Sequence, residues 1–312
     1  MTMHDIRRRV LTALALNRTP GLHFSGNFLG VQYHDITPQD VTVSLDHGAH
    51  CEDLEGHTNL AVVALLADVA AASVVRANLT PAQRLATVSL HLQFTGAPLS
   101  GPLVARSEFD SFFNGARGRQ GLSRVNLDAG GQRALFGSGA FMVLNPPPRV
   151  TMHPITSAVH AGALPLTEHE LTAAERALLV RSEAALAKSG SARGFLRELW
   201  AMQPQVTARG AQCRVDNGPH IGNRVGHMQG GLQIGLAATT ASAVLPAHWL
   251  LSAISAWFIS PGEGRSLRAT SRVVHHGGHT AVVRTVISGK ARRRVLEALT
   301  THVCGSYGPW SE

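Results

Sequence analysis

Asp68 is the side chain of this sequence best placed for acid–base chemistry. It is the one acid in a mainly apolar segment, 58–77, whose pattern predicts a helix with no polar face. Such a helix is surrounded by other structure, and a carboxylate buried there is costly unless hydrogen bonds or a counter-charge stabilise it. Desolvation raises the pKa of the acid, which suits a general base near neutral pH. The alternative is an Asp in an ordinary ion pair.

Two adjacent glycines, Gly230 and Gly231, could supply the other half of an acyl-transfer site. They begin a second apolar helix, expected over 229–245, and Asn223 lies in the loop before it. Glycines at a helix start let a ligand approach the free backbone amides, and these amides can hold a developing oxyanion. The alternative is a glycine-rich helix start that does no chemistry.

Both features belong to one pattern that occurs twice, about 170 residues apart. The copies are 53–61 and 223–231, and each is followed by an apolar helix. Aligning Gly56-His57 with Gly226-His227 sets Asp68 opposite Ala238, Asp53 opposite Asn223, and Leu60-Ala61 opposite Gly230-Gly231. Each copy keeps the half of the pattern that the other has lost, so the repeat predicts a single composite site.

The elements around both copies follow the same order. Alternating apolar and polar residues predict strands before each motif loop and a run of strands after each helix, with Phe94 and Phe258 closing the first of them. One helix followed by antiparallel strands is an α+β arrangement. The expected strands are a pair within 30–45, then 85–94, 103–113, 122–127 and 134–144, and in the second half 206–215, 250–258, 266–275, 280–288 and 295–304.

The chain is expected to form two domains, 1–147 and 205–312, joined by a helical arm, 148–204. Its length of 312 residues agrees with two domains. Pro146-Pro147-Pro148 marks the end of the first domain. Helices are expected at 172–188, starting with a capping box of Thr172 and Glu175, and at 193–202. We interpret the arm as a linker on the outside that carries no chemistry.

The formal net charge of +8 favours an acidic partner: nucleic acid, an anionic membrane surface or a phosphorylated small molecule. The arginines are spread along the chain, so the charge does not choose between these partners. Three scattered cysteines fit no disulfide framework and favour a reducing cytoplasm. The basic and apolar start resembles a signal peptide but has no cleavage site, and it predicts an amphipathic helix.

Several other classes are not expected. The longest apolar run, 60–75, is too short to span a bilayer and carries an acid. The 17 histidines show no metal-ligand spacing, so we expect no metal. A Gly-x-Ser-x-Gly nucleophile elbow is absent from the sequence.

The motif resembles that of hotdog-fold acyl-CoA thioesterases of the phenylacetate-pathway type. Their signature is an Asn, five residues, His-Gly-Gly, and an Asp in the helix that follows. The likeness covers both halves, and it implies two tandem hotdog domains, each a long helix wrapped by an antiparallel sheet, in an intramolecular pseudo-dimer. In that family the Asn and the glycine amides come from one subunit and the Asp from the other. Here Asn223, Gly230 and Gly231 would meet Asp68, whereas the opposite site, with Asp53, Asn59 and Ala238, would be inactive.

The resemblance implies hydrolysis of a thioester. The Gly231 amide, with Gly230, would polarise the carbonyl, and Asp68 would act as a base on water or as the nucleophile. Asn223 would orient the water or the substrate, and Thr87 falls where the family often has a Ser or Thr that helps to place the water. Gln229 replaces the family's His. Thr87 could equally be an ordinary β-branched strand residue.

Coenzyme A is the only cofactor-like group implied, as part of the substrate. Two turns sit where this fold often touches the nucleotide, and guanidinium groups suit phosphates. We expect Gln229 and these turns, with Arg117 and Arg119 in one and Gly277, Gly278 and His279 in the other, to bind the substrate; ordinary basic hairpins are the alternative. The resemblance implies no nucleic-acid or membrane partner, and it is compatible with homo-oligomers of pseudo-dimers.

Two rival functions stay open at this point. The first is a hotdog enoyl-CoA hydratase, because residues 216–220, Asp-Asn-Gly-Pro-His, loosely resemble its Asp and His loop. The second is a tandem hotdog that binds acyl-CoA or a protein partner without turnover. The sequence does not identify the acyl group.

Overall fold

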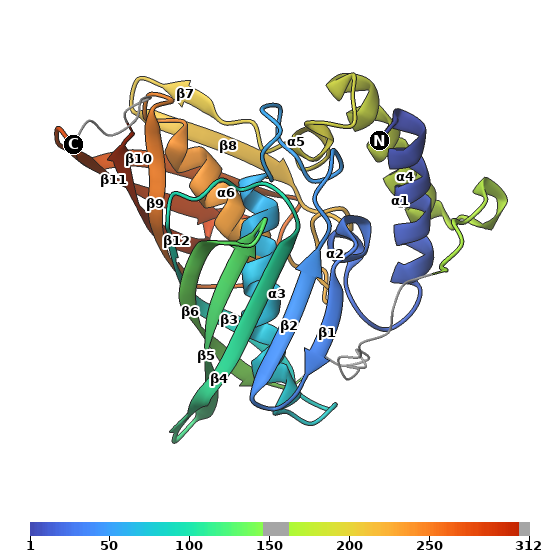
Figure 1. The fold of residues 1–312 in the computed structure, drawn as a ribbon, viewed down its shortest axis with the longest axis horizontal. Coiled ribbons are helices and arrows are strands. Elements are labelled where there is room, and N and C mark those ends of the chain that lie inside the picture. The colour runs from blue at the N-terminus through green and yellow to red at the C-terminus, as the bar shows by residue number, and fades with distance from the viewer. Residues whose placement is uncertain (146–161, 306–312) are drawn as a thin grey trace.

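Two apolar helices, α3 (Leu60–Ala77) and α6 (Gly230–Ser242), pack against each other at the centre of the protein. In the computed structural model, which describes residues 1–145 and 162–305, one antiparallel sheet of 12 strands curves around both helices (Figure 1). The core is formed where the inner face of the sheet meets the two helices. This confirms the α+β arrangement expected from the sequence.

The strand order is the same when read from the centre of the sheet to either edge. It runs β3, β6, β5, β4, β2, β1 on one side and β9, β12, β11, β10, β8, β7 on the other. Strands β3 and β9 join the halves, with residues 89–93 paired to residues 257–253. The strands are β1 (Gln32–Ile36), β2 (Asp40–Leu45), β3 (Arg84–Phe94), β4 (Leu103–Gly115), β5 (Gly118–Ala129), β6 (Gln132–Leu144), β7 (Gln205–Thr207), β8 (Gly210–Asp216), β9 (Trp249–Phe258), β10 (Ser266–His276), β11 (Thr280–Ser288) and β12 (Arg294–Cys304).

Most expected elements are confirmed, with four differences. The strand expected over 206–215 is a hairpin, β7 and β8: the chain turns at residues 208–209, and Gly210, the first residue of β8, adopts a φ of 135°. Helix α6 ends at Ser242, a few residues before Pro246. In the arm, α4 (Ala173–Ser189) begins at the expected Thr172 cap, whereas α5 (Phe195–Leu199) is shorter than expected. Near the N-terminus, helix α2 (Phe24–Leu29) was not expected from the sequence. The Pro146–Pro148 boundary lies outside the described residues.

Glycines on α6 allow the two central helices to approach each other closely. A Cβ added at Gly231 would lie 2.5 Å from the carbonyl oxygen of Ala64, and one at Gly235 would lie 2.3 Å from the Cβ of Ala61. Real side chains do not tolerate such distances, so both positions require glycine for packing. Gly231 therefore has a structural role whatever its part in chemistry.

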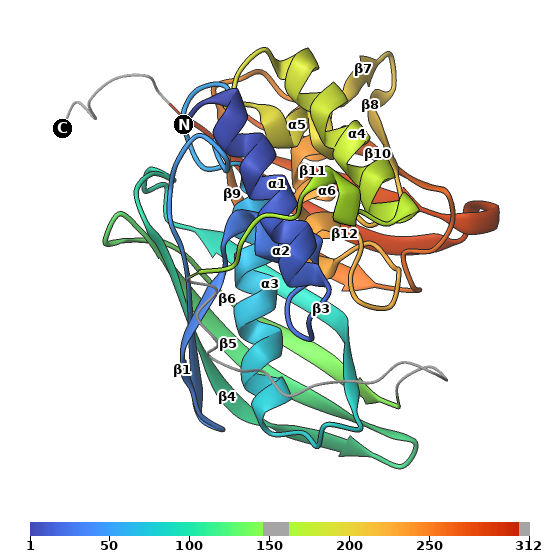
Figure 2. The ribbon, with the colours of Figure 1, turned by 90° about the vertical axis from the view of Figure 1, so that its right-hand side faces the viewer.

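A group of short helices covers the motif loops of both halves. The first helix, α1 (Met3–Asn17), is amphipathic as expected, and it packs on α2 and α4. Ion pairs of Arg7 with Glu183 and of Arg18 with Glu175, each 2.7 Å long, tie α1 to the arm. We call α1, α2, α4 and α5 the helical cap. Figure 2 shows the cap above the N-terminal end of α3, which directly follows the first motif loop.

Helix α3 has 18 residues and is long and apolar enough to cross a membrane, but 78% of it is buried inside the protein. No other helix in the described ranges has this property. Burial by its own chain identifies α3 as a core helix. All three cysteines are free.

Candidate active site

The carboxylate of Asp68 accepts three hydrogen bonds, and they come from both halves of the chain. Thr87 Oγ1 on β3 donates to Oδ1 over 3.1 Å. Gln229 Nε2 and the Gly231 backbone N–H donate to Oδ2 over 2.7 and 3.1 Å. The structure thus brings together Asp68 and Thr87 of the first half with Gln229 and Gly231 of the second.

Burial dominates the electrostatics of Asp68, whose exposed fraction is 5%. Desolvation raises the pKa of the carboxyl to about 6, although the hydrogen bonds from Thr87, Gly231 and Gln229 act in the opposite direction. A carboxyl with a pKa near 6 is largely ionised at neutral pH and still basic enough to accept a proton.

Gln229 has two contacts that fix the orientation of its side-chain amide. Its Oε1 caps α6 by accepting the N–H of Leu232 over 2.8 Å, so its Nε2 is the atom left to donate to Asp68. From the sequence, Gln229 was assigned only to substrate binding. Its position as the N-cap of α6 was readable, but its contact with a carboxylate 161 residues earlier was not.

Gly230 lies against the same carboxylate. A Cβ added there would be 2.9 Å from Asp68 Oδ2 and 3.1 Å from Thr87 Oγ1, so a larger residue would press on both groups. Within the described residues the backbone N–H of Gly230 has no hydrogen-bond partner, whereas that of Gly231 is engaged by Asp68. Gly230 therefore offers the free amide at this helix end.

Asn223 and Asp53 shape the two motif loops in the same way. Asn223 Oδ1 accepts the N–H groups of Val225 and His227 over 3.0 and 3.1 Å. Asp53 Oδ1 accepts the equivalent N–H groups of Glu55 and His57 over 3.0 and 2.9 Å. Neither side chain forms a hydrogen bond with Asp68 in the described structure. Their shared feature is a turn that closes the loop.

The equivalent position in the other half has neither the acid nor the hydroxyl. Ala238 is buried on α6, and Asn59 only caps α3 by accepting the N–H of Ala61 over 2.9 Å. Strands β3 and β9 each have an irregularity at the same distance before Phe94 and Phe258, and this places Leu251 where β3 has Thr87. Ala238, Asn59 and Leu251 thus carry neither a carboxylate nor a hydroxyl group.

The two turns expected to bind coenzyme A occupy equivalent hairpins. Arg117 and Arg119 lie at the β4–β5 turn, where the Arg119 guanidinium stacks 4.0 Å from the ring centre of Phe112. Gly277 closes the β10–β11 turn by donating its N–H to Thr280 O over 2.9 Å, and His279 O accepts the N–H of Cys304. None of these residues forms a hydrogen bond with Asp68 or with its partners Thr87, Gln229 and Gly231. Both hairpins lie at the ends of long strands (Figure 1).

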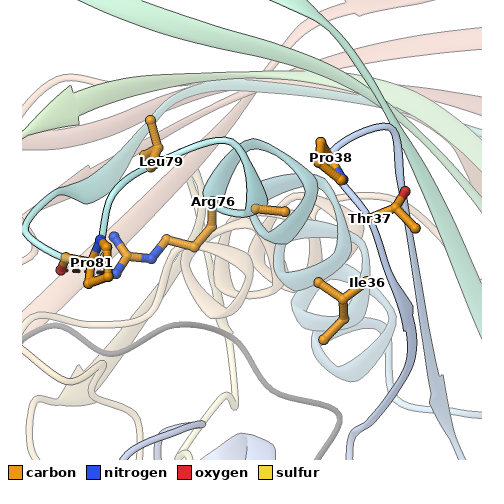
Figure 3. Close-up of a pocket in the computed structure, with 7 residues that line it drawn as sticks. Ile36, Thr37, Pro38, Arg76, Leu79 and Pro81 are labelled. Carbon is orange, nitrogen blue, oxygen red and sulfur yellow. Dashed lines mark hydrogen bonds between the residues drawn. The ribbon is translucent and has the colours of Figure 1, made fainter.

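A cavity of about 160 Å³ lies at the C-terminal end of α3 (Figure 3). It is lined by Ile36, Thr37, Pro38, Arg76, Ala77, Leu79 and Pro81. Asp68, Ala72 and Arg76 are spaced four residues apart along α3, so a strip of one helix face leads from the carboxylate to the cavity. Burial lowers the pKa of the Arg76 guanidinium, which remains charged. The cavity is comparable in size to one of about 150 Å³ that holds benzene in another protein.

Among the residues that the structure describes, no group of three or more His, Cys, Asp or Glu side chains is arranged to hold a metal ion.

Solved structures with a similar fold include proteins named as thioesterases. The TesB protein of Mycobacterium avium subspecies paratuberculosis superposes with a TM-score of 0.50 over 88% of this chain and 96% of its own, at 11% identity. A protein assigned as an oleoyl thioesterase from Lactobacillus plantarum gives 0.52 over 93% and 99%, at 11% identity. The 12:0-ACP thioesterase of Umbellularia californica gives 0.51 over 84% and 93%, at 9% identity.

The chain has the fold of these thioesterases. Coverage of most of both chains confirms the expected likeness to thioesterases of this fold across the two halves together. No protein-family model matches the sequence, and comparison with curated proteins gives no significant match. The phenylacetate-pathway type of the resemblance stays a prediction.

Proposed function

We propose that this protein is an acyl-CoA thioesterase with one composite active site between two hotdog domains that form an intramolecular pseudo-dimer. The observation that carries the proposal is the buried carboxylate of Asp68, held by Thr87 of its own half and by Gln229 and Gly231 of the other. The thioesterase fold supports the same reaction class. The domains would be 1–147 and 205–312, and the single acid makes the opposite site inactive.

Asp68 is assigned as the general base. It would take a proton from water as the water oxygen attacks the thioester carbonyl, and the free N–H of Gly230 would stabilise the oxyanion. Collapse of the tetrahedral intermediate breaks the C–S bond, and the proton on Asp68 passes to the leaving thiolate. The products are the free acid and coenzyme A.

The neighbouring groups keep this carboxylate in position. Gln229 and the Gly231 N–H hold Oδ2, so we assign the Gly231 amide to positioning and the Gly230 amide to carbonyl polarisation. Thr87 holds Oδ1, and its hydroxyl oxygen would accept a hydrogen bond from the attacking water. Asn223 acts through the loop turn and orients the segment that leads to Gln229.

The acyl group is proposed to extend along Ala72 toward the cavity at Arg76. Asp68 and Arg76 are eight residues apart, or about 12 Å along the helix axis. The carrier phosphates would meet arginines of the basic surface, with Arg117, Arg119 and the turn at Gly277, Gly278 and His279 as candidates. Three free cysteines fit a cytoplasmic setting.

Thiol release from a panel of acyl-CoAs and acyl-ACPs of different chain length tests the proposal. The parent protein should release thiol from at least one class, Asp68→Asn should abolish release, and Asp53→Asn should retain it. Absence of hydrolysis on every thioester, with the protein folded, would reject the thioesterase assignment. Hydrolysis of acyl-ACP alone would move the carrier assignment from coenzyme A to the acidic carrier protein.

The hydratase alternative has no structural support. His220, in the loop that resembles the hydratase motif, is buried under the cap, and burial lowers its pKa to about 4. Asn217 Nδ2 holds backbone carbonyls of Gly262 and Gly264, so it is a loop-forming residue. The alternative of a non-catalytic binder makes a different prediction. The parent protein would bind its ligand without turnover, and Asp68→Asn would bind it with unchanged affinity.

A further inference from the structure

One side chain of the loop that precedes Gln229, that of Arg224, makes four hydrogen bonds to the helical cap. Arg224 donates from Nη1 to Asn17 O over 2.8 Å and from Nε to Gly21 O over 3.2 Å. Its Nη2 donates to Thr19 O and Leu22 O over 2.7 and 2.5 Å. The four carbonyls belong to the end of α1 and the link to α2. A planar guanidinium can satisfy this many acceptors at once, which a lysine ammonium cannot.

The loop behind Arg224 is a short, closed unit. The Asn223 turn and a β-bridge between Gly222 and Met228 close it, and the next residue is Gln229. A second anchor lies at its start, where His220 O accepts hydrogen bonds from Ser25 Oγ and Trp200 Nε1 over 2.8 and 3.1 Å. The cap therefore holds this loop at two points, His220 and Arg224, and both precede the segment that leads to Gln229.

The first loop is attached to the cap by different residues. Leu54 occupies the position equivalent to Arg224 and packs near Gly194. The arm holds this loop through an ion pair of Arg193 with Glu52 and through the Gly194 N–H, which donates to Glu52 O over 3.3 Å. This loop leads to Asn59 and the position without an acid. Each motif loop thus has its own attachment to the helices around it, and the attachment through Arg224 adjoins the proposed active site.

We propose that Arg224 is a positioning residue of the active site: by fixing its loop to the end of α1, it holds Gln229 and the Gly231 amide against Asp68 and keeps the Gly230 amide in place for the carbonyl. This inference rests on the proposed thioesterase function. It makes the end of α1 part of the architecture that supports the site, and the arm supports it indirectly through its ion pairs with Arg7 and Arg18.

Steady-state kinetics of Arg224→Ala and Arg193→Ala, with the parent, test the inference. Arg224→Ala should lower kcat on the order of 10- to 100-fold, because small displacements of reacting groups are costly, while KM changes little. Arg193→Ala removes the matched anchor on the other loop and should leave kcat within about twofold of the parent. Equal kcat values for the two variants would overturn the inference.

The pH profile separates positioning from a general loss of structure. Gln229 lowers the pKa of Asp68, so a displaced Gln229 should move the acid limb of kcat/KM to higher pH in Arg224→Ala and not in Arg193→Ala. Arg224→Lys, which keeps the charge but fewer carbonyl contacts, should be intermediate and provides the test if Arg224→Ala does not fold. An unshifted acid limb in both Arg224 variants would contradict the positioning role.

Amide hydrogen exchange gives an answer even if the parent hydrolyses no thioester, so failure of the proposed function and failure of this inference remain distinguishable. Arg224→Ala should increase exchange over residues 223–232 and not over residues 53–62. Equal exchange of residues 223–232 in variant and parent would reject the anchor.

Discussion

Gln229 Nε2 lies 2.7 Å from Asp68 Oδ2 and donates a hydrogen bond across the boundary between the two halves of the chain. The opposite end of the same amide caps α6. The position of the helix and the position of the carboxylate are therefore coupled through one side chain. The predictions below follow from this coupling and from the burial of Asp68.

Activity should depend on the ionised form of Asp68. Because its pKa is raised to about 6, kcat/KM of the parent should fall as the pH is lowered through about 6. Asp68→Asn should reduce kcat by about 10²- to 10⁴-fold, the range typical of a lost general base. Rate measurements between pH 4.5 and 8 check both points, with Asp53→Asn as control. A parent rate that stays constant down to pH 4.5 would contradict the assignment.

The same burial should make Asp68 destabilising at neutral pH. The folded-state pKa, about 6, lies above the ordinary aspartate pKa of 3.8, so the folded protein binds the proton more tightly than the unfolded chain. Stability is then lost as the pH rises from about 4 through 6, and at pH 7 the loss is about 2–3 kcal/mol. Asp68→Asn should unfold at higher denaturant concentration than the parent at pH 7 and at a similar concentration near pH 3.5. A variant less stable than the parent at pH 7 would show that the charge is compensated.

Gln229→Glu should shift the pH dependence of the site upward. A second carboxylate beside Asp68 replaces a donor with a like charge, and both changes raise the pKa of Asp68. The acid limb of kcat/KM should move to higher pH by about one unit or more. Asn59→Asp introduces the same change at the equivalent helix cap of the other half and should leave the limb in place. Matching shifts in both variants would indicate a general charge effect.

Two alanine substitutions on α6 should separate catalysis from packing. Gly230→Ala places a methyl group against Asp68 and Thr87, so it should reduce kcat strongly at a modest stability cost. Gly235→Ala places it on Ala61 and should lower the free energy of unfolding by about 1–3 kcal/mol or more, with a smaller change in kcat. Urea titrations and rate assays on both variants check this division, which the reverse pattern would contradict.

Filling the cavity at the end of α3 should change chain-length preference. Ala77 lines the cavity, so Ala77→Leu should lower kcat/KM for long acyl chains relative to short ones. One or two methyl-sized groups alter such discrimination by about 10- to 200-fold. Ala187→Leu, at an exposed position of α4, serves as the control. An unchanged ratio of long to short substrates would place the acyl group elsewhere.

Much of the fold could be predicted from the sequence because its signals are local. Alternation located the strands and the apolar runs located α3 and α6, since side-chain periodicity follows directly from backbone geometry. The duplicated pattern at 53–61 and 223–231 predicted matching loops, and their turns and bridges are indeed the same, whereas the helix caps Asn59 and Gln229 accept different backbone N–H groups. Asp68 could be identified without knowledge of its partners, because a carboxylate in an apolar helix is costly unless some group of the protein binds it.

The identity of those partners was decided only by the tertiary structure. The family resemblance assigned Asn223 to the water or the substrate and the Gly231 amide to the carbonyl. In the structure Asn223 closes a turn and the Gly231 amide donates to the carboxylate. Hydrogen bonds over about 3 Å depend on how closely α3 and α6 pack, and the depth of that contact is set by residues on both helices together. The anchor likewise joins Arg224 to Asn17, which is about 200 positions earlier in the sequence. Local sequence patterns do not show which residues meet over such a separation.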